Sequence, residues 1–162
     1  MKKIDDISNL FNAQLPKGVF LNCRHQGIDN TMTIGWGSIG VMWGKPVLTV
    51  VVRYSRFTYE LLSKTDAFTV SIPEANMMKE ALKICGTLSG RNIDKFEKAG
   101  LTKEQAKYVD APVIAGCELQ IECKTLYKQS MEPGLLNESI DKRNYANKDY
   151  HVFFIGEIVE SY

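Results

Sequence analysis

The chain has 162 residues, of which 44% are hydrophobic and 24% are charged. This composition is ordinary for a globular protein, and it excludes intrinsic disorder, collagen-like repeats and low complexity. Lys and Arg number 20 against 19 Asp and Glu, so the net charge is only +1. Such a balance gives no broad basic field for nucleic-acid binding, and the length favours a single domain over residues 1–162.

The longest apolar run, residues 47–52, is too short to cross a bilayer. The N-terminal segment lacks the apolar core of a signal peptide. We therefore expect a cytoplasmic protein without a membrane partner, in which the four cysteines stay reduced. Because no CxxC pair occurs and the two histidines lie far apart in the sequence, no metal site is predicted.

Hydrophobic periodicity predicts a short first helix over residues 4–15. Strands rich in Val, Ile, Thr and Phe are predicted at residues 19–23, 31–36, 47–52, 67–72, 113–127 and 151–159. Further short helices are predicted at residues 58–64, 74–84 and 94–98. Capping-box spacing at Ser71 and Glu74, and again at Thr102 and Gln105, predicts two helix starts. Residues 131–149 are expected to form a long polar loop.

These predicted helices are too few and too short to alternate one for one with the strands, as a doubly wound fold requires. The pattern favours a mainly β fold, an antiparallel barrel with helical insertions. Residues 35–40 match the GxGxxG fingerprint of dinucleotide-binding proteins, which needs a helix directly after the glycines. Gly44 and Pro46 prevent such a helix here, so we interpret the segment as a glycine-rich connection between strands.

Residues 53–60, Arg-Tyr-Ser-Arg-Phe-Thr-Tyr-Glu, place two guanidinium groups and two hydroxyls where a strand gives way to a helix. Helix N-terminal N–H groups attract anions, and Arg, Ser and Thr supply further donors, so the segment suits a phosphate group. The alternative is that Ser55 or Thr58 is a simple N-cap and that the arginines are solvated.

Residues 30–36 alternate so that Thr31 and Thr33 share one face. Their hydroxyls and the backbone can bond a planar polar ring, against which Met32 and Trp36 can pack. The alternative is a barrel strand whose threonines face solvent.

Two further segments carry polar groups. Residues 85–96 present Ser89, Arg91 and Lys95 around a helix start, or form only a connecting loop. His151 opens the last strand, where a neutral imidazole can hydrogen-bond a ligand amide and an imidazolium can face a phosphate. A purely structural histidine is the alternative.

In this order and spacing, the segments 30–36, 53–58, 85–96, 127–129 and 150–158 resemble the flavin reductase-like, FMN-binding split-barrel family, which includes the flavoredoxins. The resemblance extends from about residue 22 to about residue 160. It implies a Greek-key-like, antiparallel split barrel that forms a homodimer and binds one FMN per subunit near the interface.

The resemblance also implies roles for individual residues. The isoalloxazine ring would be lined by Thr31, Met32, Thr33 and Trp36, largely through their backbone. The phosphate would be held by Arg53, Ser55 and Thr58. The ribityl-phosphate side would be approached by Ser89, Gly90 and Lys95. His151 would lie near the open face of the flavin, where a nicotinamide docks in the reductases.

The implied activity is that of an FMN-dependent reductase, in which NAD(P)H donates a hydride to flavin N5 and a small molecule or protein accepts the electrons. Flavoredoxin-like sequences often have an acidic residue where this chain has Ser130 and a basic residue where it has Val152, which leaves the electron donor and acceptor open. One alternative is a flavoredoxin-type electron carrier reduced by a protein partner. Another is a non-catalytic split barrel that binds a different ligand, such as haem.

Overall fold

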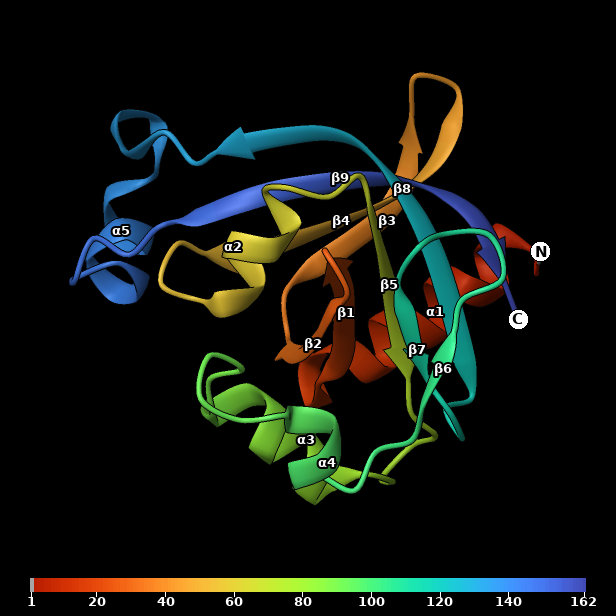
Figure 1. The fold of residues 1–162 in the computed structure, drawn as a ribbon. Coiled ribbons are helices and arrows are strands. Elements are labelled where there is room, and N and C mark those ends of the chain that lie inside the picture. The colour runs from red at the N-terminus through yellow and green to blue at the C-terminus, as the bar shows by residue number, and fades with distance from the viewer. Residues whose placement is uncertain (1) are drawn as a thin grey trace.

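The computed structural model describes residues 2–162 and consists mainly of antiparallel strands (Figure 1). The strands are β1 (Val19–His25), β2 (Ile28–Ile34), β3 (Gly37–Met42), β4 (Lys45–Arg53), β5 (Ala67–Ile72), β6 (Lys103–Gln105), β7 (Pro112–Ile114), β8 (Leu119–Ser130) and β9 (His151–Ser161). Seven of them form one curled sheet in the order β2-β1-β5-β8-β9-β4-β3, and β6 pairs with β7. The mainly β, antiparallel fold that the sequence predicts is therefore confirmed.

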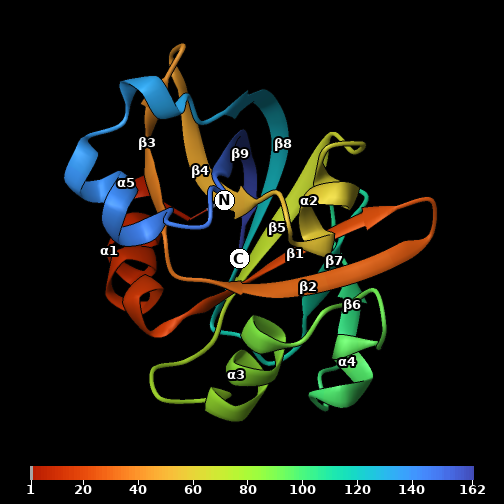
Figure 2. The same ribbon diagram turned by 90° about the vertical axis from the view of Figure 1, so that its left-hand side faces the viewer.

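Helices cover the ends and one side of this sheet. They are α1 (Ile4–Gln14), η1 (Leu15–Lys17), α2 (Phe57–Leu62), α3 (Lys79–Thr87), α4 (Lys95–Lys98), η2 (Pro133–Leu135) and α5 (Glu138–Asn144). In Figure 2, β2 runs between α3 on one side and α5 on the other. Among residues 2–162, none of these helices has the length and apolar character needed to cross a bilayer.

Two tight hairpins set the register at the edges of the sheet. Gln26 and Gly27 join β1 to β2, and Trp43 and Gly44 join β3 to β4, all with positive φ. Two consecutive residues with positive φ are the signature of turns whose twist matches that of the flanking strands. The strands β2 and β3 form the two edges of the sheet, and the short segment 35–36 connects them.

The core lies inside the curl of the sheet and under α1. The helix α1 buries Ile7 and Phe11 against the inner faces of the strands. Where β8 and β9 curl tightly, β9 passes close to its neighbours at Gly156, because a Cβ there would lie 2.7 Å from Phe68 and 2.8 Å from Cys123. Burial of these apolar faces supplies the main stabilisation of the sheet.

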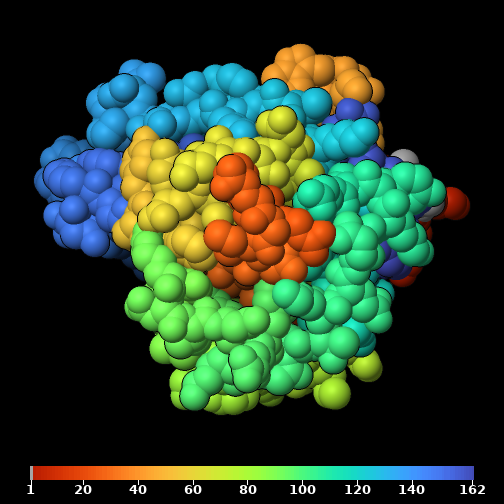
Figure 3. Space-filling model, in the orientation of Figure 1, coloured from red at the N-terminus to blue at the C-terminus, as the bar shows by residue number. Residues whose placement is uncertain are grey.

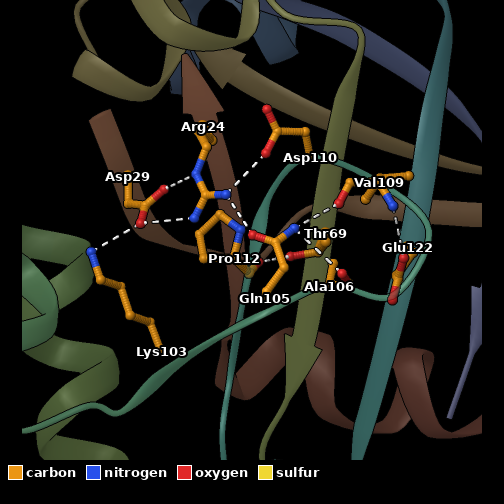
Figure 4. Close-up of polar contacts among 10 residues, drawn as sticks. All are labelled: Arg24, Asp29, Thr69, Lys103, Gln105, Ala106, Val109, Asp110, Pro112 and Glu122. Atoms are coloured by element: carbon orange, nitrogen blue, oxygen red, sulfur yellow. Dashed lines mark hydrogen bonds and ion pairs between the residues drawn. The ribbon is translucent and has the colours of Figure 1, made fainter. Parts of the chain in front are cut away.

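A polar network ties the β1–β2 hairpin to the β6–β7 ribbon (Figure 4). Arg24 on β1 donates to Asp29 on β2 at 2.6 Å and to Asp110 at 2.9 Å, and Lys103 on β6 donates to Asp29 at 2.9 Å. Figure 3 shows the result on the surface, where the hairpin tip (orange-red) lies between α2 (yellow) and the segment around β6 (teal).

The fully buried carboxylate of Glu122 on β8 holds the turn before β7. It accepts backbone N–H bonds from Lys107, Tyr108 and Val109 at 2.7, 2.7 and 3.2 Å. Several such donors compensate the cost of burying a carboxylate. The turn is therefore fixed to the sheet by a charge-assisted contact.

Three predicted segments among the strands differ from the structure. The predicted strand 113–127 is two strands, because Gly116 with φ +77 turns the chain between β7 and β8. The strand predicted at 31–36 ends at Ile34, and the glycine-rich segment 35–40 is mostly strand β3 instead of a connection. Glycine lowers the apparent strand propensity of β3, although pairing with β4 stabilises it.

Both predicted capping boxes are wrong. Ser71 lies inside β5 and is buried, and the helix α3 begins only at Lys79, after Met78 in a left-handed conformation. Residues 103–105 form the strand β6 and not a helix. The predicted polar loop 131–149 contains the short helices η2 and α5, the second of which is capped by the side chain of Asn137.

Candidate functional site

Two cavities adjoin on the side of the barrel that faces α5 and α3. One, of about 200 Å³, is lined by the end of β2, residues 35–36, the end of β4 and His151; we call it the histidine cavity. The other, of about 160 Å³, is lined by the loop before α2, the end of α3 and Lys95; we call it the lysine cavity. Met32 and Arg56 line both. Neither alone reaches the roughly 300 Å³ of an ordinary ligand site, but the shared residues make them neighbours, and we consider them together.

The lysine cavity has the donor set of an anion site. Arg56, Arg91 and Lys95 line it together with several hydroxyl groups, and no carboxylate is among its lining residues. Lys95 is only 5% exposed, and its ammonium donates to the carbonyl of Cys85 at 3.0 Å. Within residues 2–162 it has no ion-pair partner. Burial lowers the pKa of Lys95 to about 8, and an anionic ligand would offset the cost of burying its positive charge.

Local structure explains why Lys95 points inward. The carboxylate of Asp94 caps α4 by accepting from the backbone of Phe96 at 2.8 Å, as predicted for a helix over 94–98. The cap fixes the first turn of α4, and Phe96 then packs into the small core formed with α3. The lysine is thereby placed between α3 and β2.

Thr58 and Gly90 both line the lysine cavity, and both lie close to the side chain of Asn30 on β2. The Asn30 amide donates to the hydroxyl oxygen of Thr58 at 2.8 Å. The hydroxyl proton of Thr58 therefore remains for another acceptor. A Cβ at Gly90 would lie 2.1 Å from Asn30 Oδ1, so only glycine allows this close approach. Ser89 lines the same cavity.

Ser55 also lines the lysine cavity, but its donors are engaged by the segment before β9. Its backbone N–H and its hydroxyl donate to the carboxylate of Asp149 at 3.1 and 2.5 Å. The helix α2 has six residues and no side-chain cap, so Ser55 and Thr58 are not its N-caps. The donors of the lysine cavity are therefore mainly side chains, and the dipole of the short helix α2 contributes little to them.

Arg53 lines the histidine cavity and holds the segment that follows α5. Its guanidinium donates to the carbonyls of Asp149 at 2.6 Å and Asn144 at 3.1 Å, and it lies 4.9 Å from the ring centre of Tyr145. Arg53 thus lines the histidine cavity and not the lysine cavity, whereas Arg56 lines both.

His151 forms the floor of the histidine cavity. It is 8% exposed, its Nδ1 lies 2.7 Å from the hydroxyl of Tyr145, and its ring centre lies 5.1 Å from that of Trp36. Burial, together with the charge of Arg53, lowers the pKa of His151 to about 4. The imidazole is therefore neutral near pH 7 and acts as a hydrogen-bonding group.

The strand β2 presents its backbone to the histidine cavity. Because β2 is an edge strand that pairs only with β1, half of its N–H and C=O groups are free of the sheet ladder. Met32 and Thr33 line the cavity, but the Thr33 hydroxyl donates to the carbonyl of Leu82 at 2.6 Å. Thr31 is fully buried and lines neither cavity.

The structure thus brings together most of the residues predicted from the sequence. The histidine cavity gathers Met32, Thr33, Trp36, Arg53 and His151. The lysine cavity gathers Ser55, Thr58, Ser89, Gly90 and Lys95.

The family resemblance assigned no cofactor-binding role to Arg56 or Arg91, although the sequence placed both in candidate polar segments, and it assigned none to Tyr145 or Asp149. Arg56 had a signal, since it lies three residues after Arg53 in the segment predicted to bind an anion. Tyr145 and Asp149 had none, because they lie in the polar segment whose path depends on tertiary contacts.

Cys85 lines neither cavity, and its thiol is buried. Burial raises the pKa of Cys85 to about 11, so the thiol is protonated and unreactive near neutral pH. Among the residues described, no group of three His, Cys, Asp or Glu side chains is arranged to hold a metal ion.

Comparison with known proteins places this geometry in a family. An uncharacterised protein of Archaeoglobus fulgidus is 27% identical over 154 residues, which cover 95% of this chain and 76% of that protein. The flavoredoxin of Desulfovibrio vulgaris (Miyazaki F) has a similar structure, with a TM-score of 0.71 and 27% identity over 90% of this chain and 68% of that one.

An FMN-binding domain of a flavin reductases-like enzyme from Shewanella baltica has the same fold, with a TM-score of 0.71 and 22% identity over 99% of this chain and 74% of that one. The family model described as the flavin reductase like domain matches residues 13–162. The resemblance seen in the sequence is therefore confirmed, and the chain belongs to the flavin reductase-like domain family.

Proposed function

We propose that the two adjoining cavities bind one FMN molecule, with the phosphate in the lysine cavity and the ring in the histidine cavity. The observation that carries this proposal is that the two cavities are lined by different kinds of side chain. One cavity is lined by three cationic side chains and no carboxylate. The other combines apolar and aromatic side chains, beside a free strand edge, with the guanidinium groups of Arg53 and Arg56. A ligand with an anionic end and a flat polar ring fits both.

The residues of each cavity suit their part of FMN. Lys95 and Arg56 would neutralise the phosphate, and the hydroxyl proton of Thr58 has no acceptor among the described residues. The backbone of β2 at Met32 and Thr33 would hydrogen-bond the ring edge, with Trp36 beside it. When bound, the flavin supplies the redox chemistry by accepting a hydride and passing electrons on.

We further propose that the protein is an NAD(P)H-dependent reductase in which His151 orients the nicotinamide. The neutral imidazole offers one N–H donor at the wall of the histidine cavity. It does not serve as a proton store near pH 7, because its pKa is about 4. Of the two ligand contacts that the sequence allows for His151, a neutral ring supports the hydrogen bond to a ligand amide and not the imidazolium that faces a phosphate.

The test is a visible absorption spectrum of the protein incubated with FMN, before and after anaerobic addition of NADH or NADPH. We expect protein-bound flavin bands that bleach promptly with at least one nucleotide. Absence of any bound flavin would refute the FMN site. Bands that bleach only with a chemical reductant would refute the reductase and leave the FMN site intact.

A flavoredoxin-type electron carrier is the second candidate, favoured by the similarity to the flavoredoxin of Desulfovibrio vulgaris. In that case a reduced protein partner reduces the flavin quickly, whereas NADH and NADPH reduce it slowly. Stopped-flow reduction with each donor distinguishes the two functions.

We also propose a homodimer. Val41, Met42 and Trp43 on the β3–β4 hairpin are 70%, 41% and 60% exposed, which is a large apolar surface for one hairpin tip. Size-exclusion chromatography with light scattering should give twice the 18.3 kDa of the chain. A monomer at high micromolar concentration would refute the dimer.

A further inference from the structure

Tyr145 contacts His151 behind the histidine cavity. It follows α5, is 2% exposed, and its hydroxyl lies 2.7 Å from His151 Nδ1. The two rings meet edge to face, with centres 5.6 Å apart and an angle of 84°. Among residues 2–162, Tyr145 is the only hydrogen-bond partner of a His151 ring nitrogen. The direction of this hydrogen bond therefore decides whether Nε2 carries the imidazole proton, and so whether Nε2 is a donor or an acceptor.

The position of Tyr145 is fixed from two further sides. The guanidinium of Arg53 lies over its ring, and the ring of Tyr150 stacks on it with centres 4.9 Å apart and an angle of 22°. Arg53 also binds the carbonyls on either side of this segment, those of Asn144 and Asp149. The tyrosine is therefore held rigidly enough to orient the imidazole.

The direction of the hydrogen bond follows from the protons available. The neutral imidazole carries one proton, and burial raises the pKa of Tyr145, so the hydroxyl keeps its proton as well. If Nδ1 carried the imidazole proton, the Tyr145 hydroxyl would accept it and its own buried proton would have no acceptor among the described residues. A buried unsatisfied donor is costly. The favoured arrangement has Tyr145 donating to Nδ1, with the imidazole proton on Nε2.

The charges around His151 agree with a neutral ring. Arg53 on β4 and Arg56 before α2 both disfavour the imidazolium. The carboxylate of Asp149 favours it, but that carboxylate is already bound by the N–H and hydroxyl of Ser55. In catalytic histidines that become protonated, a carboxylate accepts a hydrogen bond from Nδ1–H and stabilises the imidazolium. Here the neutral hydroxyl of Tyr145 occupies that position beside Nδ1.

We propose that Tyr145 is a positioning residue that fixes His151 in the Nε2–H tautomer, so that the histidine cavity offers a neutral N–H donor to a carbonyl oxygen. Within the proposed reductase, on which this part rests, that oxygen belongs to the carboxamide of the nicotinamide. A neutral donor suits a carbonyl acceptor and gives no particular attraction to an anion. His151 would thereby select the nicotinamide end of the nucleotide, while the lysine cavity selects phosphate.

The tautomer can be tested without FMN or turnover. Long-range ¹H–¹⁵N correlation spectra of the full chain with ¹⁵N-labelled histidine, at pH 7, report which ring nitrogen carries the proton. We expect the proton on Nε2 and Nδ1 as an acceptor. A proton on Nδ1 in the wild-type protein would overturn the proposal, whatever the variants do.

Tyr145→Phe removes the hydroxyl and keeps the ring. We expect a several-fold rise in the Nδ1–H population and a changed Nδ1 resonance. The matched control is Tyr150→Phe, which removes a hydroxyl from the same segment; that hydroxyl donates to Asp141 at 2.6 Å and does not touch His151. An unchanged His151 spectrum in Tyr145→Phe, or equal changes in both variants, would contradict the positioning role.

The ligand class is tested separately on the FMN-loaded protein. Tyr145→Phe should raise the KM for the reduced nicotinamide nucleotide about threefold to tenfold, while the Kd for FMN changes less than twofold. Tyr150→Phe should change neither. If the tautomer result holds but no nucleotide reduces the flavin, the reductase proposal fails and the positioning role of Tyr145 stands. If nucleotide reduction is normal and KM does not change, the carbonyl contact is refuted.

Discussion

Ser55 gives both its backbone N–H and its hydroxyl to the carboxylate of Asp149. An acidic side chain thus engages donors that were expected to bind phosphate. The contact joins the start of α2 to the segment before β9, at the wall of the lysine cavity. In the proposed FMN site, phosphate binding and the position of this segment would therefore be linked through one serine.

The first prediction concerns this link. Asp149→Asn removes the negative charge and keeps the backbone carbonyl that binds Arg53, so FMN should bind about two to ten times more tightly. Quenching of FMN fluorescence in a titration measures the affinity. Asp141→Asn is the control, because Asp141 lies in the same segment and bonds Tyr150 and Lys148 instead of Ser55. Equal affinities for both variants and the wild type would contradict the competition.

The second prediction concerns Lys95. Lys95→Met should weaken FMN binding at least about tenfold, because the phosphate loses a charge-assisted hydrogen bond. In the wild-type protein, affinity should fall by up to about tenfold per pH unit above pH 8, since binding then requires Lys95 to take up a proton. This fall should be absent in the variant.

Lys98→Met is the matched control for Lys95, since it changes an exposed lysine of the same helix. It should preserve both the affinity and its pH dependence. The pKa of Lys95 in the folded protein lies below the ordinary 10.5, so the unfolded chain binds more protons between pH 8 and 10.5. Lys95 therefore makes the free energy of unfolding rise with pH in that window.

The third prediction concerns His151. Its pKa of about 4 lies below the ordinary 6.5, so the unfolded chain binds more protons between these values, and the free energy of unfolding falls as the pH decreases through that range. Urea unfolding should show that His151→Gln removes about 2–3 kcal/mol of this fall between pH 7 and pH 4.

In the FMN-loaded protein, His151→Gln should impair turnover with NAD(P)H more than it impairs FMN retention. Normal turnover would refute the orienting role. Because His151 is already neutral, the pH profile of turnover between pH 6 and 8 should not depend on this residue.

The fourth prediction concerns Gly90. Gly90→Ala would place a Cβ 2.1 Å from Asn30 Oδ1 and 3.0 Å from the ring of Phe57, so Asn30 must move away from Thr58. We expect a loss of about 1–3 kcal/mol in the free energy of unfolding, together with weaker FMN binding. Gly40→Ala on β3 is the control, because its Cβ would meet nothing within 4 Å. Chemical denaturation of both variants checks the difference.

The sequence predicts best where local pattern and tertiary environment agree. The strand β5 is predicted with its observed bounds, because alternation, β-branched residues and flanking turn residues all indicate the same element. The strand β3 is missed because glycines mask it, and its existence depends on pairing with β4. The start of α3 is misplaced because Ser71, which resembles a cap, bonds Gln120 within the core instead.

The candidate site shows the same contrast between residues found by local pattern and partners that only the fold brings close. Lys95, Thr58 and Gly90 occur in short motifs, so their convergence on one cavity follows from the family pattern. The partners that give these groups their chemistry come from far along the chain. Asn30 reaches Thr58, Asp149 reaches Ser55, and only the folded sheet brings them together.

The curled sheet ends in two strands that do not pair with each other, and both cavities lie close to the end of β2, one of these edges. Strand pairing therefore does not close the sheet here, and residues 35–36 join the two edge strands. A flat molecule in the histidine cavity, which is lined by the ends of β2 and β4, would break no interstrand ladder, so its binding demands little of the global stability of the barrel. The strength of the sheet and the speed of ligand exchange are thus separate properties, and selection can tune one without the other.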